Sequence, residues 1–245
     1  LSFKKWFMVP VGWRNQYCGV FQYKYKDVVY YFIDNEYYFN RDGLYGYYDD
    51  GERFAFFNRA VLEFIKEIDW KPDLINCNDW QTGMVPVILN LEYKDDKFYS
   101  KMETVFSIHN LLFKGSFVPN VLPELFGYDY MPLTNGSVEL NGSVSFLKGG
   151  INYCDEITTV SNTYAEEIKT QQGGEGLDGL LRSKSEILNE IVNGIDYEEF
   201  NPEEDKFIFK NFNCNNIKDK IENKLSLQKE LGLPQKEDTP MIGLI

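Results

Sequence analysis

The sequence predicts an α/β fold in which helices flank a parallel sheet and a β-rich hairpin insertion precedes them. Short apolar runs alternate with segments that carry helical signals rather than hairpin turns, which is typical of βαβ units. Each run passes into a polar residue, which would lie at the carboxyl edge of a parallel sheet, where ligand clefts form. The runs are residues 74–77, 105–108, 157–160 and 190–192.

The first forty residues favour β-structure. Aromatic and β-branched residues dominate 4–11, 20–25 and 28–34, and the last two segments are joined by a turn at Lys26-Asp27. We interpret them as a hairpin insertion.

A helix is expected next. Asp49, with Glu52 three residues on, resembles a capping box in which aspartate replaces the usual Ser or Thr. Helical spacing then predicts a single apolar stripe that packs on a sheet. The stripe consists of Phe54, Phe57, Val61, Phe64, Ile65 and Ile68.

The sequence predicts the local structure of three later segments. A helix over 80–93 contains Pro86, which imposes a kink or a late start. The long stretch 110–141 is rich in Pro, Gly and aromatic residues, and a loop of this length is usually functional or flexible. The glycine-rich segment 171–179 does not directly follow a strand and lacks a Gly-Lys-Ser/Thr ending, so we interpret it as a mobile turn between helices and not as a P-loop.

The final forty residues predict one helix and the start of a strand. Residues 216–231 form an amphipathic pattern that ends near Gly232 and Pro234. Residues 234–240 are charged and linker-like, and 241–245 are expected to begin another strand.

Composition excludes several classes of function. A formal net charge of −13 disfavours nucleic acid and anionic membranes as partners, because both require a basic surface. No apolar run approaches the roughly 20 residues that span a bilayer. The first residues lack the layout of a signal peptide, but the chain begins at Leu1, so a targeting segment stays open.

Four widely spaced cysteines and one histidine do not match the usual zinc patterns, so we expect no metal. Cys77 and Cys154 border apolar runs and are expected to be buried free thiols, which fits a reducing compartment.

The single histidine, His109, follows one of the apolar runs. Asp79, Ser161 and Asn193 follow the other three, so all four would share one edge of the sheet. A structural explanation competes with a functional one, because Asn, Asp and Ser favour helix N-caps and turns, and a histidine can serve structure.

Nine sequence blocks resemble one family and fall in its order across essentially the whole chain. The chain is similar to bacterial glycogen synthases and plant starch synthases. The blocks are Gly12-Trp13-Arg14-Asn15-Gln16, 30–38, 44–57, Asn78-Asp79-Trp80-Gln81-Thr82-Gly83, Ile108-His109-Asn110-Leu111, Phe146-Leu147-Lys148-Gly149-Gly150, 159–164, 174–181 and 192–196.

The resemblance implies a GT-B fold of two Rossmann-like domains that transfers glucose from ADP-glucose to the nonreducing end of an α-1,4-glucan with retention, without a further cofactor. It covers the first domain only: residues 1–233 would be an incomplete N-terminal domain, and 234–245 a linker and the start of the second. The family's Lys-x-Gly-Gly donor loop has no match here. A bacterial member would be cytoplasmic, while a plastid location stays open. Oligomeric state is not indicated.

The resemblance also assigns site residues. His109 matches a catalytic histidine beside the transferred glucose, and Asp79 and Trp80 match a pair near the acceptor. Asn193 matches an active-site asparagine near the sugar, and Asn110 of the same block as His109 is assigned to substrate binding. Each has a structural alternative: Asp79 as a helix cap, Trp80 in the core, Asn193 in a turn. Ser161-Asn162 stands where many members have Ser-Pro, and Lys148 has no established role.

The chemistry adds a constraint. Breaking a sugar–phosphate bond without a metal requires fixed positive charge at the departing diphosphate. In the family those cations lie in the donor loop and the second domain, so we expect no measurable transfer by this chain alone. His109 is expected to orient the glucose and not to act as a nucleophile.

Other functions remain as alternatives. A noncatalytic glucan-binding module would suit the aromatic content of 16%, and its glucan affinity would be unaffected by His109→Ala. A serine hydrolase would need a Gly-x-Ser-x-Gly elbow around a residue such as Ser161, and none is present. A phosphorylase would need a lysine site for pyridoxal phosphate, for which there is no motif.

Overall fold

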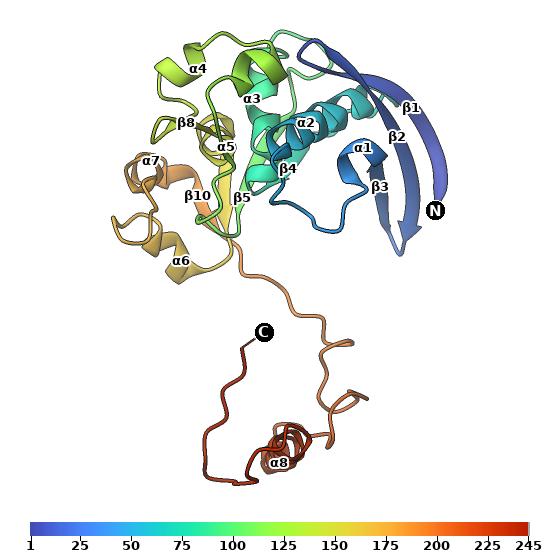
Figure 1. The fold of residues 1–245 in the computed structure, drawn as a ribbon, viewed down its shortest axis with the longest axis vertical. Coiled ribbons are helices and arrows are strands. Elements are labelled where there is room, and N and C mark those ends of the chain that lie inside the picture. The colour runs from blue at the N-terminus through green and yellow to red at the C-terminus, as the bar shows by residue number, and fades with distance from the viewer. Residues whose placement is uncertain (245) are drawn as a thin grey trace. The chain divides into compact units, whose positions relative to one another are not determined.

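The structure is a computed structural model that describes residues 1–244. It divides into two compact units, Leu1–Val192 and the residues from Asn193 onward. The first unit contains three sheets and the helices that pack on them (Figure 1). None of the helices in residues 1–244 is long and apolar enough to cross a membrane.

The N-terminal strands form an antiparallel sheet in the order β1 (Ser2–Val11), β2 (Arg14–Tyr25) and β3 (Val28–Asp34). All three predicted strands are confirmed, although β2 begins six residues before the expected start at 20. Phe7, Val9 and Val11 alternate along β1 and are buried, whereas Trp6 and Met8 on the other face are exposed. The short α1 (Glu36–Phe39) follows, capped by the Asn35 side chain.

The helix α2 (Asp50–Glu67) packs against β1, and the prediction of a single apolar stripe is wrong. Polar residues on the other sides of the helix, among them Arg53, Asn58 and Arg59, are buried together with the apolar ones. Contacts with β1 and β3 on one hand and α3 on the other enclose it. A helix enclosed on several sides does not show the one-sided pattern of a surface helix.

The capping-box prediction places the N-cap of α2 correctly, but the predicted hydrogen bond from the side chain is not formed. Asp49 is the N-cap residue of α2, but its side chain makes no cap hydrogen bond. Its carboxylate instead accepts two hydrogen bonds from Arg41, at 3.1 and 2.7 Å. A bidentate guanidinium contact is stronger than a hydrogen bond to a neutral backbone amide, so it has replaced the cap.

The second sheet is parallel, as predicted, with the order β10-β9-β5-β4. Three strands lie where the apolar runs place them, but β10 ends at Glu190 and not at Val192, so the predicted end of that strand is wrong. Ile191 and Val192 are largely exposed. The strands are β4 (Leu74–Asn78), β5 (Glu103–Ile108), β9 (Glu156–Thr159) and β10 (Leu188–Glu190).

The two faces of this sheet differ. Phe106 and Ile157 are fully buried on one face, where Gly150 of α5 (Phe146–Tyr153) lies against the Phe106 ring. A Cβ on Gly150 would come within 2.4 Å of that ring. On the other face the Ser107 hydroxyl lies 2.9 Å from Asn76 Oδ1 and 2.7 Å from Thr158 Oγ1. The sheet therefore has an apolar face under α5 and a row of polar groups opposite it.

The helix α3 (Met84–Leu91) packs on α5. A 3-10 turn over Trp80–Thr82 precedes it, so Pro86 lies in the first turn of α3, and the late start is confirmed. Proline is tolerated there because the first amides of a helix have no partner within it.

The stretch 110–145 contains several short elements instead of a structureless loop. They include β6 (Ser116–Phe117), a π-helical turn at Leu122–Phe126, α4 (Met131–Thr134), β7 (Glu139–Leu140) and β8 (Ser143–Ser145). The strands form a small sheet in the order β6-β8-β7.

The glycine-rich segment does lie between two helices, α6 (Asn162–Glu167) and α7 (Asp178–Ser183), followed by a 3-10 turn at Ser185–Ile187. It is a tightly packed turn: a Cβ on Gly173 or Gly174 would lie 2.6 or 2.7 Å from backbone carbonyl oxygens of Glu167 or Ile168. Lys114 Nζ contacts Glu175 of this turn at 3.2 Å. The glycines therefore allow close approach of two backbones.

The second unit contains a 3-10 turn at Ile217–Asp219 and α8 (Lys220–Glu230), so the predicted helix starts four residues later than expected. Gly232 has φ +67° after the helix, which confirms the predicted stop. Residues 241–244 form no strand, contrary to expectation, and Ile245 lies outside the described residues.

Candidate functional site

The candidate site lies at the carboxyl edge of the parallel sheet, where β4 and β5 end side by side. Asn78 pairs with Ser107 in the register of the two strands, and Asp79 N donates to Ser107 O at 3.0 Å. Two polar residues that are 30 positions apart in sequence, Asp79 and His109, are thereby brought to adjacent strand ends.

Asp79 holds the segment that follows β5. Its Oδ1 accepts hydrogen bonds from the backbone N–H groups of His109 at 2.8 Å and Asn110 at 3.5 Å. The predicted alternative, a side-chain cap of the following helical turn, is not made. Asp79 has φ +54° and ψ −172°, a conformation that costs an L-residue about 1–3 kcal/mol. Strain of this kind persists only where surrounding contacts enforce it.

The His109 ring is exposed, and its Nε2 lies 2.9 Å from Asn78 Oδ1. Because an amide oxygen only accepts, this contact assigns the proton to Nε2 and leaves Nδ1 as an acceptor in the neutral ring. Asn110 is also exposed, and its Oδ1 accepts from Leu112 N at 3.0 Å in a local turn. The edge thus presents one ring nitrogen and one amide group.

Trp80 is 5% exposed and lies among aromatic rings. Its ring centroid is 4.7 Å from that of Phe54 and 5.9 Å from that of Phe117, and Gly115 packs against the indole. This burial supports the core as the place of Trp80, and its contact with a sugar stays a prediction. Its rigid packing fixes the backbone next to Asp79.

Tyr164 of α6, the helix that follows β9 and is capped by Ser161, contacts the same loop. The Ser161 side chain caps α6 by accepting from Tyr164 N at 3.3 Å, so its observed role is structural. The Tyr164 hydroxyl accepts from Leu111 N at 2.8 Å, which anchors the residue two positions after His109. Burial raises the Tyr164 pKa, so the phenol stays neutral at physiological pH.

Two further residues named from the sequence lie elsewhere. Asn193 is exposed and begins the second unit, three residues after β10 ends, so its place at the edge stays a prediction. Lys148 Nζ donates to the backbone oxygen of Glu139 at 2.6 Å, which ties α5 to β7. Lys148 therefore has a structural partner.

Sequence reasoning missed two residues, Asn78 and Tyr164. Asn78 and Asn76 alternate with apolar residues on β4, and polar residues at that period on an otherwise apolar strand were the available signal. Tyr164 gives no comparable signal, because its contact with Leu111 joins residues 53 positions apart.

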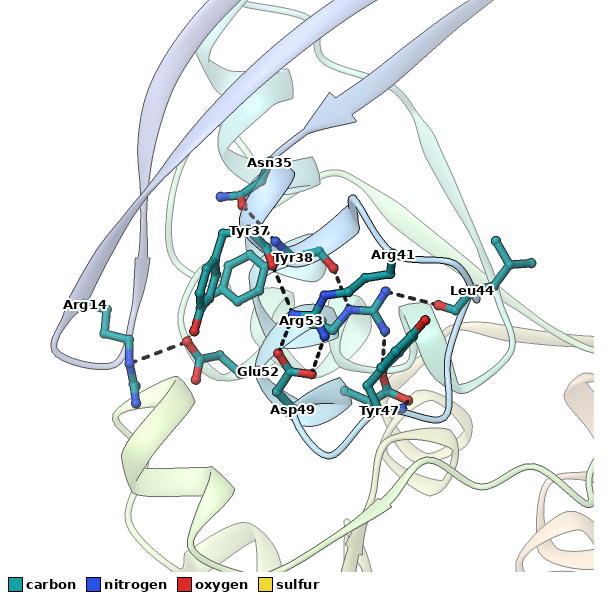
Figure 2. A network of polar contacts seen from close by, with 11 residues as sticks. Arg14, Asn35, Tyr37, Tyr38, Arg41, Leu44, Tyr47, Asp49, Glu52 and Arg53 are labelled. Atoms are coloured by element: carbon teal, nitrogen blue, oxygen red, sulfur yellow. Dashed lines mark hydrogen bonds and ion pairs between the residues drawn. The ribbon is translucent and has the colours of Figure 1, made fainter.

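A second polar cluster lies between the antiparallel sheet and the start of α2 (Figure 2). Arg53, 2% exposed, donates from Nε to Tyr38 O at 2.7 Å and from Nη2 to Leu44 O at 3.2 Å, and it forms an ion pair with Asp50. Asp50 in turn accepts from Gly46 N at 2.6 Å. The pair therefore fixes the loop that leads into α2.

The outer part of this cluster runs from Tyr38 to Glu52 and Arg14. The Tyr38 hydroxyl donates to Glu52 Oε1 at 2.6 Å, and Arg14 Nε lies 3.5 Å from the same oxygen. Burial raises the Tyr38 pKa, and the Glu52 contact adds to the rise. The buried Nη1 of Arg14 has no hydrogen-bond partner in residues 1–244.

Donors and acceptors at the sheet edge suit a ligand rich in hydroxyl groups, because imidazole, carboxylate and amide groups bind hydroxyls directionally. The fold and this edge define an α/β protein whose ligand site lies at the ends of parallel strands. Residues 1–183 match the sequence model of the family described as starch synthase catalytic domain. The chain belongs to that family.

Named relatives agree with this membership. The chain is 66% identical to a glycogen synthase of Clostridium perfringens over 245 residues, 100% of this chain and 51% of the relative. It is 50% identical to a glycogen synthase of Alkaliphilus metalliredigens, over 97% of this chain and 50% of that protein. The chain therefore spans about half the length of the curated relatives it matches.

A solved structure is similar as well. The catalytic domain of Starch Synthase IV from Arabidopsis thaliana, bound to ADP and acarbose, matches with a TM-score of 0.82 and 31% sequence identity. The match covers 96% of this chain and 48% of that chain. The fold class expected from the sequence resemblance is confirmed.

Proposed function

We propose that this chain is part of a glycogen synthase that transfers glucose from ADP-glucose to the nonreducing end of an α-1,4-glucan with retention of configuration. The observation that carries the proposal is the contact from Asp79 Oδ1 to His109 N, which joins two family motifs at the sheet edge. The relatives' names and the ADP and acarbose bound by the Arabidopsis protein support it.

In this proposal His109 orients the transferred glucose. With Nε2 donating to Asn78, Nδ1 is free to accept a hydrogen bond from a sugar hydroxyl. Asp79 fixes the backbone that carries the ring, so that the ring needs no rearrangement when the sugar binds. Asn110 supplies an amide near the sugar, Trp80 supports the acceptor side from the core, and Asn193 contributes a further amide.

The departing diphosphate needs positive charge, and the lysines nearest the site in sequence already have partners. Lys114 contacts Glu175 at 3.2 Å, and Lys148 donates to a backbone oxygen. We therefore infer that other residues of a complete GT-B protein hold the phosphates, and that this chain alone is inactive. In that scheme residues 1–233 belong to the N-terminal domain and 234–245 lead into the second.

A reducing compartment, the bacterial cytoplasm, fits the cysteines. Cys18, Cys77, Cys154 and Cys214 are all free, and the first three are buried. Burial raises the pKa of Cys18 and of Cys154 to about 12, so these thiols are unreactive at neutral pH.

A chimera tests the proposed activity. The chain replaces the matching half of the Clostridium perfringens relative, and the incorporation of glucose from ADP-glucose into maltoheptaose is measured. We expect elongation by the chimera, none by the chain alone, and retention of the α-linkage in the product. A folded chimera that transfers no glucose would contradict the proposed activity, while rapid transfer by the chain alone would contradict the inferred source of the phosphate-binding cations.

A further inference from the structure

The structure contains a cavity of about 550 Å³ that is separate from the sheet edge. Three parts of the first unit line it: Arg14 of β2, the start of α2, and the segment 116–125 that contains β6 and the π-helical turn. We propose that this cavity binds a segment of an α-1,4-glucan chain away from its reacting end. The choice of ligand rests on the proposed function.

The cavity walls are held in place without a ligand. Gly12 has φ +58°, and its N–H donates to Leu125 O at 2.8 Å; a Cβ there would lie 1.8 Å from Glu124 O. The β1–β2 turn is therefore fixed directly against the π-helical turn. Gly51 of α2 likewise packs against the Phe117 ring, where a Cβ would lie 3.1 Å from the ring. Such preorganisation lowers the entropy that binding would otherwise cost.

Hydrogen-bonding groups around the cavity have free capacity. Within residues 1–244, the Ser116 hydroxyl and the Glu124 carboxylate make no hydrogen bond or ion pair, and Asn120 engages only its Oδ1, with Tyr130. Arg14 contacts Glu52 through Nε and its Nη1 is buried, so the free donors at the cavity are the Ser116 hydroxyl and the Asn120 amide nitrogen. Figure 2 shows the far end of the Arg14 guanidinium pointing away from the cluster. Free donors and free acceptors occur side by side.

Free hydrogen-bond donors and acceptors together with few positive charges favour a neutral ligand with many hydroxyl groups. The carboxylates of Asp49, Glu52 and Glu124 outnumber the single cation Arg14, which disfavours a phosphate or another anion. Free charged and polar groups disfavour an apolar ligand, because their desolvation would be uncompensated. A sugar hydroxyl both donates and accepts, and so satisfies either kind of group.

Exposed aromatic rings complete the site. Tyr48 lines the cavity and is 97% exposed, and Trp13, 78% exposed, lies under the Arg14 guanidinium at 4.6 Å. Exposed rings beside free polar groups provide apolar faces for pyranose rings. Phe117, which lines the cavity, also contacts Trp80, so the cavity connects through two rings to the residue next to Asp79.

Binding is tested on the chain itself by titration calorimetry with maltoheptaose. Tyr48→Ala and Asn120→Ala change exposed side chains, so both variants should fold. We expect each to weaken binding about three- to tenfold, the range of one aromatic or hydrogen-bond contact. The matched control Tyr197→Ala removes an exposed tyrosine of the second unit and should leave the affinity unchanged. Cellohexaose, a β-1,4 chain, should bind more weakly.

The chimera separates this proposal from the proposed function. Tyr48→Ala should raise the KM for long glucans several-fold and leave kcat and the KM for maltose unchanged, because in this proposal the cavity holds only the part of a glucan that lies away from its reacting end. Equal affinity of the wild-type chain and both variants for maltoheptaose, or no measurable binding by the wild-type chain, would overturn the cavity site. Both of these calorimetric results are independent of glucose transfer, so the cavity site and the proposed activity can fail separately.

Discussion

The sheet edge around His109 and the cluster around Arg53 are both rich in polar side chains, but they use them differently. At Arg53 the guanidinium has partners at all three nitrogens and is buried. At the edge a single carboxylate, Asp79, holds two backbone N–H groups, while the ring of His109 and the amide of Asn110 remain exposed. Satisfied and buried polar groups stabilise the fold, whereas positioned and exposed ones can bind a ligand.

The largest effect is expected from Arg53→Ala. It leaves Asp50 buried without its cation, and breaking a buried pair costs about 3–5 kcal/mol. Urea unfolding followed by tryptophan fluorescence measures it, since all four tryptophans lie in the first unit. Arg182→Ala is the control: it removes an ion pair with Asp178 that is 54% exposed on the arginine side and one exposed hydrogen bond to Lys169 O, so the loss should stay below about 2 kcal/mol. Equal losses of unfolding free energy in the two variants would show that the buried Arg53 cluster stabilises the fold no more than an exposed ion pair does.

The next largest effect is expected on activity from Asp79→Ala. Loss of the carboxylate frees the His109 backbone, and misplacement by about 1 Å can reduce a rate roughly 100-fold. Transfer by the chimera measures the effect, and Asp79→Asn, which retains an acceptor oxygen, should recover part of the rate. An Asp79→Ala chimera of full activity would show that the edge is not part of the site.

The backbone strain at Asp79 can be measured separately, by comparing the stability of two variants that both lack the carboxylate. Glycine adopts φ +54° without the strain that a Cβ imposes, so Asp79→Gly should be more stable than Asp79→Ala by about 1–3 kcal/mol. Both variants lack the carboxylate, and neither should regain activity. Urea unfolding of the two variants side by side isolates the backbone strain; identical midpoints would exclude it.

Asn78→Ala should have a smaller effect, about fivefold on kcat of the chimera, because one hydrogen bond of roughly 1 kcal/mol orients the ring. The KM for the glucan should change little. Asn76→Ala is a matched control on the same strand, since Asn76 contacts Ser107 and not His109. The conservative variant Asn78→Asp keeps an acceptor oxygen for Nε2 and should recover part of kcat, whereas a purely structural defect would not respond to the retained acceptor.

The smallest effect concerns pH. Burial alone would raise the Asp49 pKa, but the hydrogen bond and charge of Arg41 lower it below its usual 3.8. The ionised pair therefore contributes stability that is fully present above pH 4 and is lost as the pH falls through the lower folded pKa. Asp49→Asn should cost about 1 kcal/mol at pH 7 and less below pH 4 in urea unfolding. Asp95→Asn, which changes an exposed carboxylate, is the control.

Much of the parallel sheet was predictable from local patterns. Apolar runs of strand length, separated by helical segments, located β4, β5 and β9, because a strand in such a sheet must bury apolar side chains. The end of β10 was misplaced because Ile191 and Val192 are apolar yet exposed. Hydrophobicity alone could not separate a strand from the exposed chain that follows it.

The site was predictable in its residues but not in its contacts. The sequence by itself determined that Asp79 and His109 follow consecutive strands, because the order of strands along the chain and the polar residues that follow them is local information. Only the tertiary structure decided that Asp79 binds the His109 backbone instead of capping a helix, that Asn78 orients the ring, and that Trp80 is buried. These outcomes depend on the parallel register between β4 and β5, which joins residues about 30 positions apart through contacts that no local pattern records.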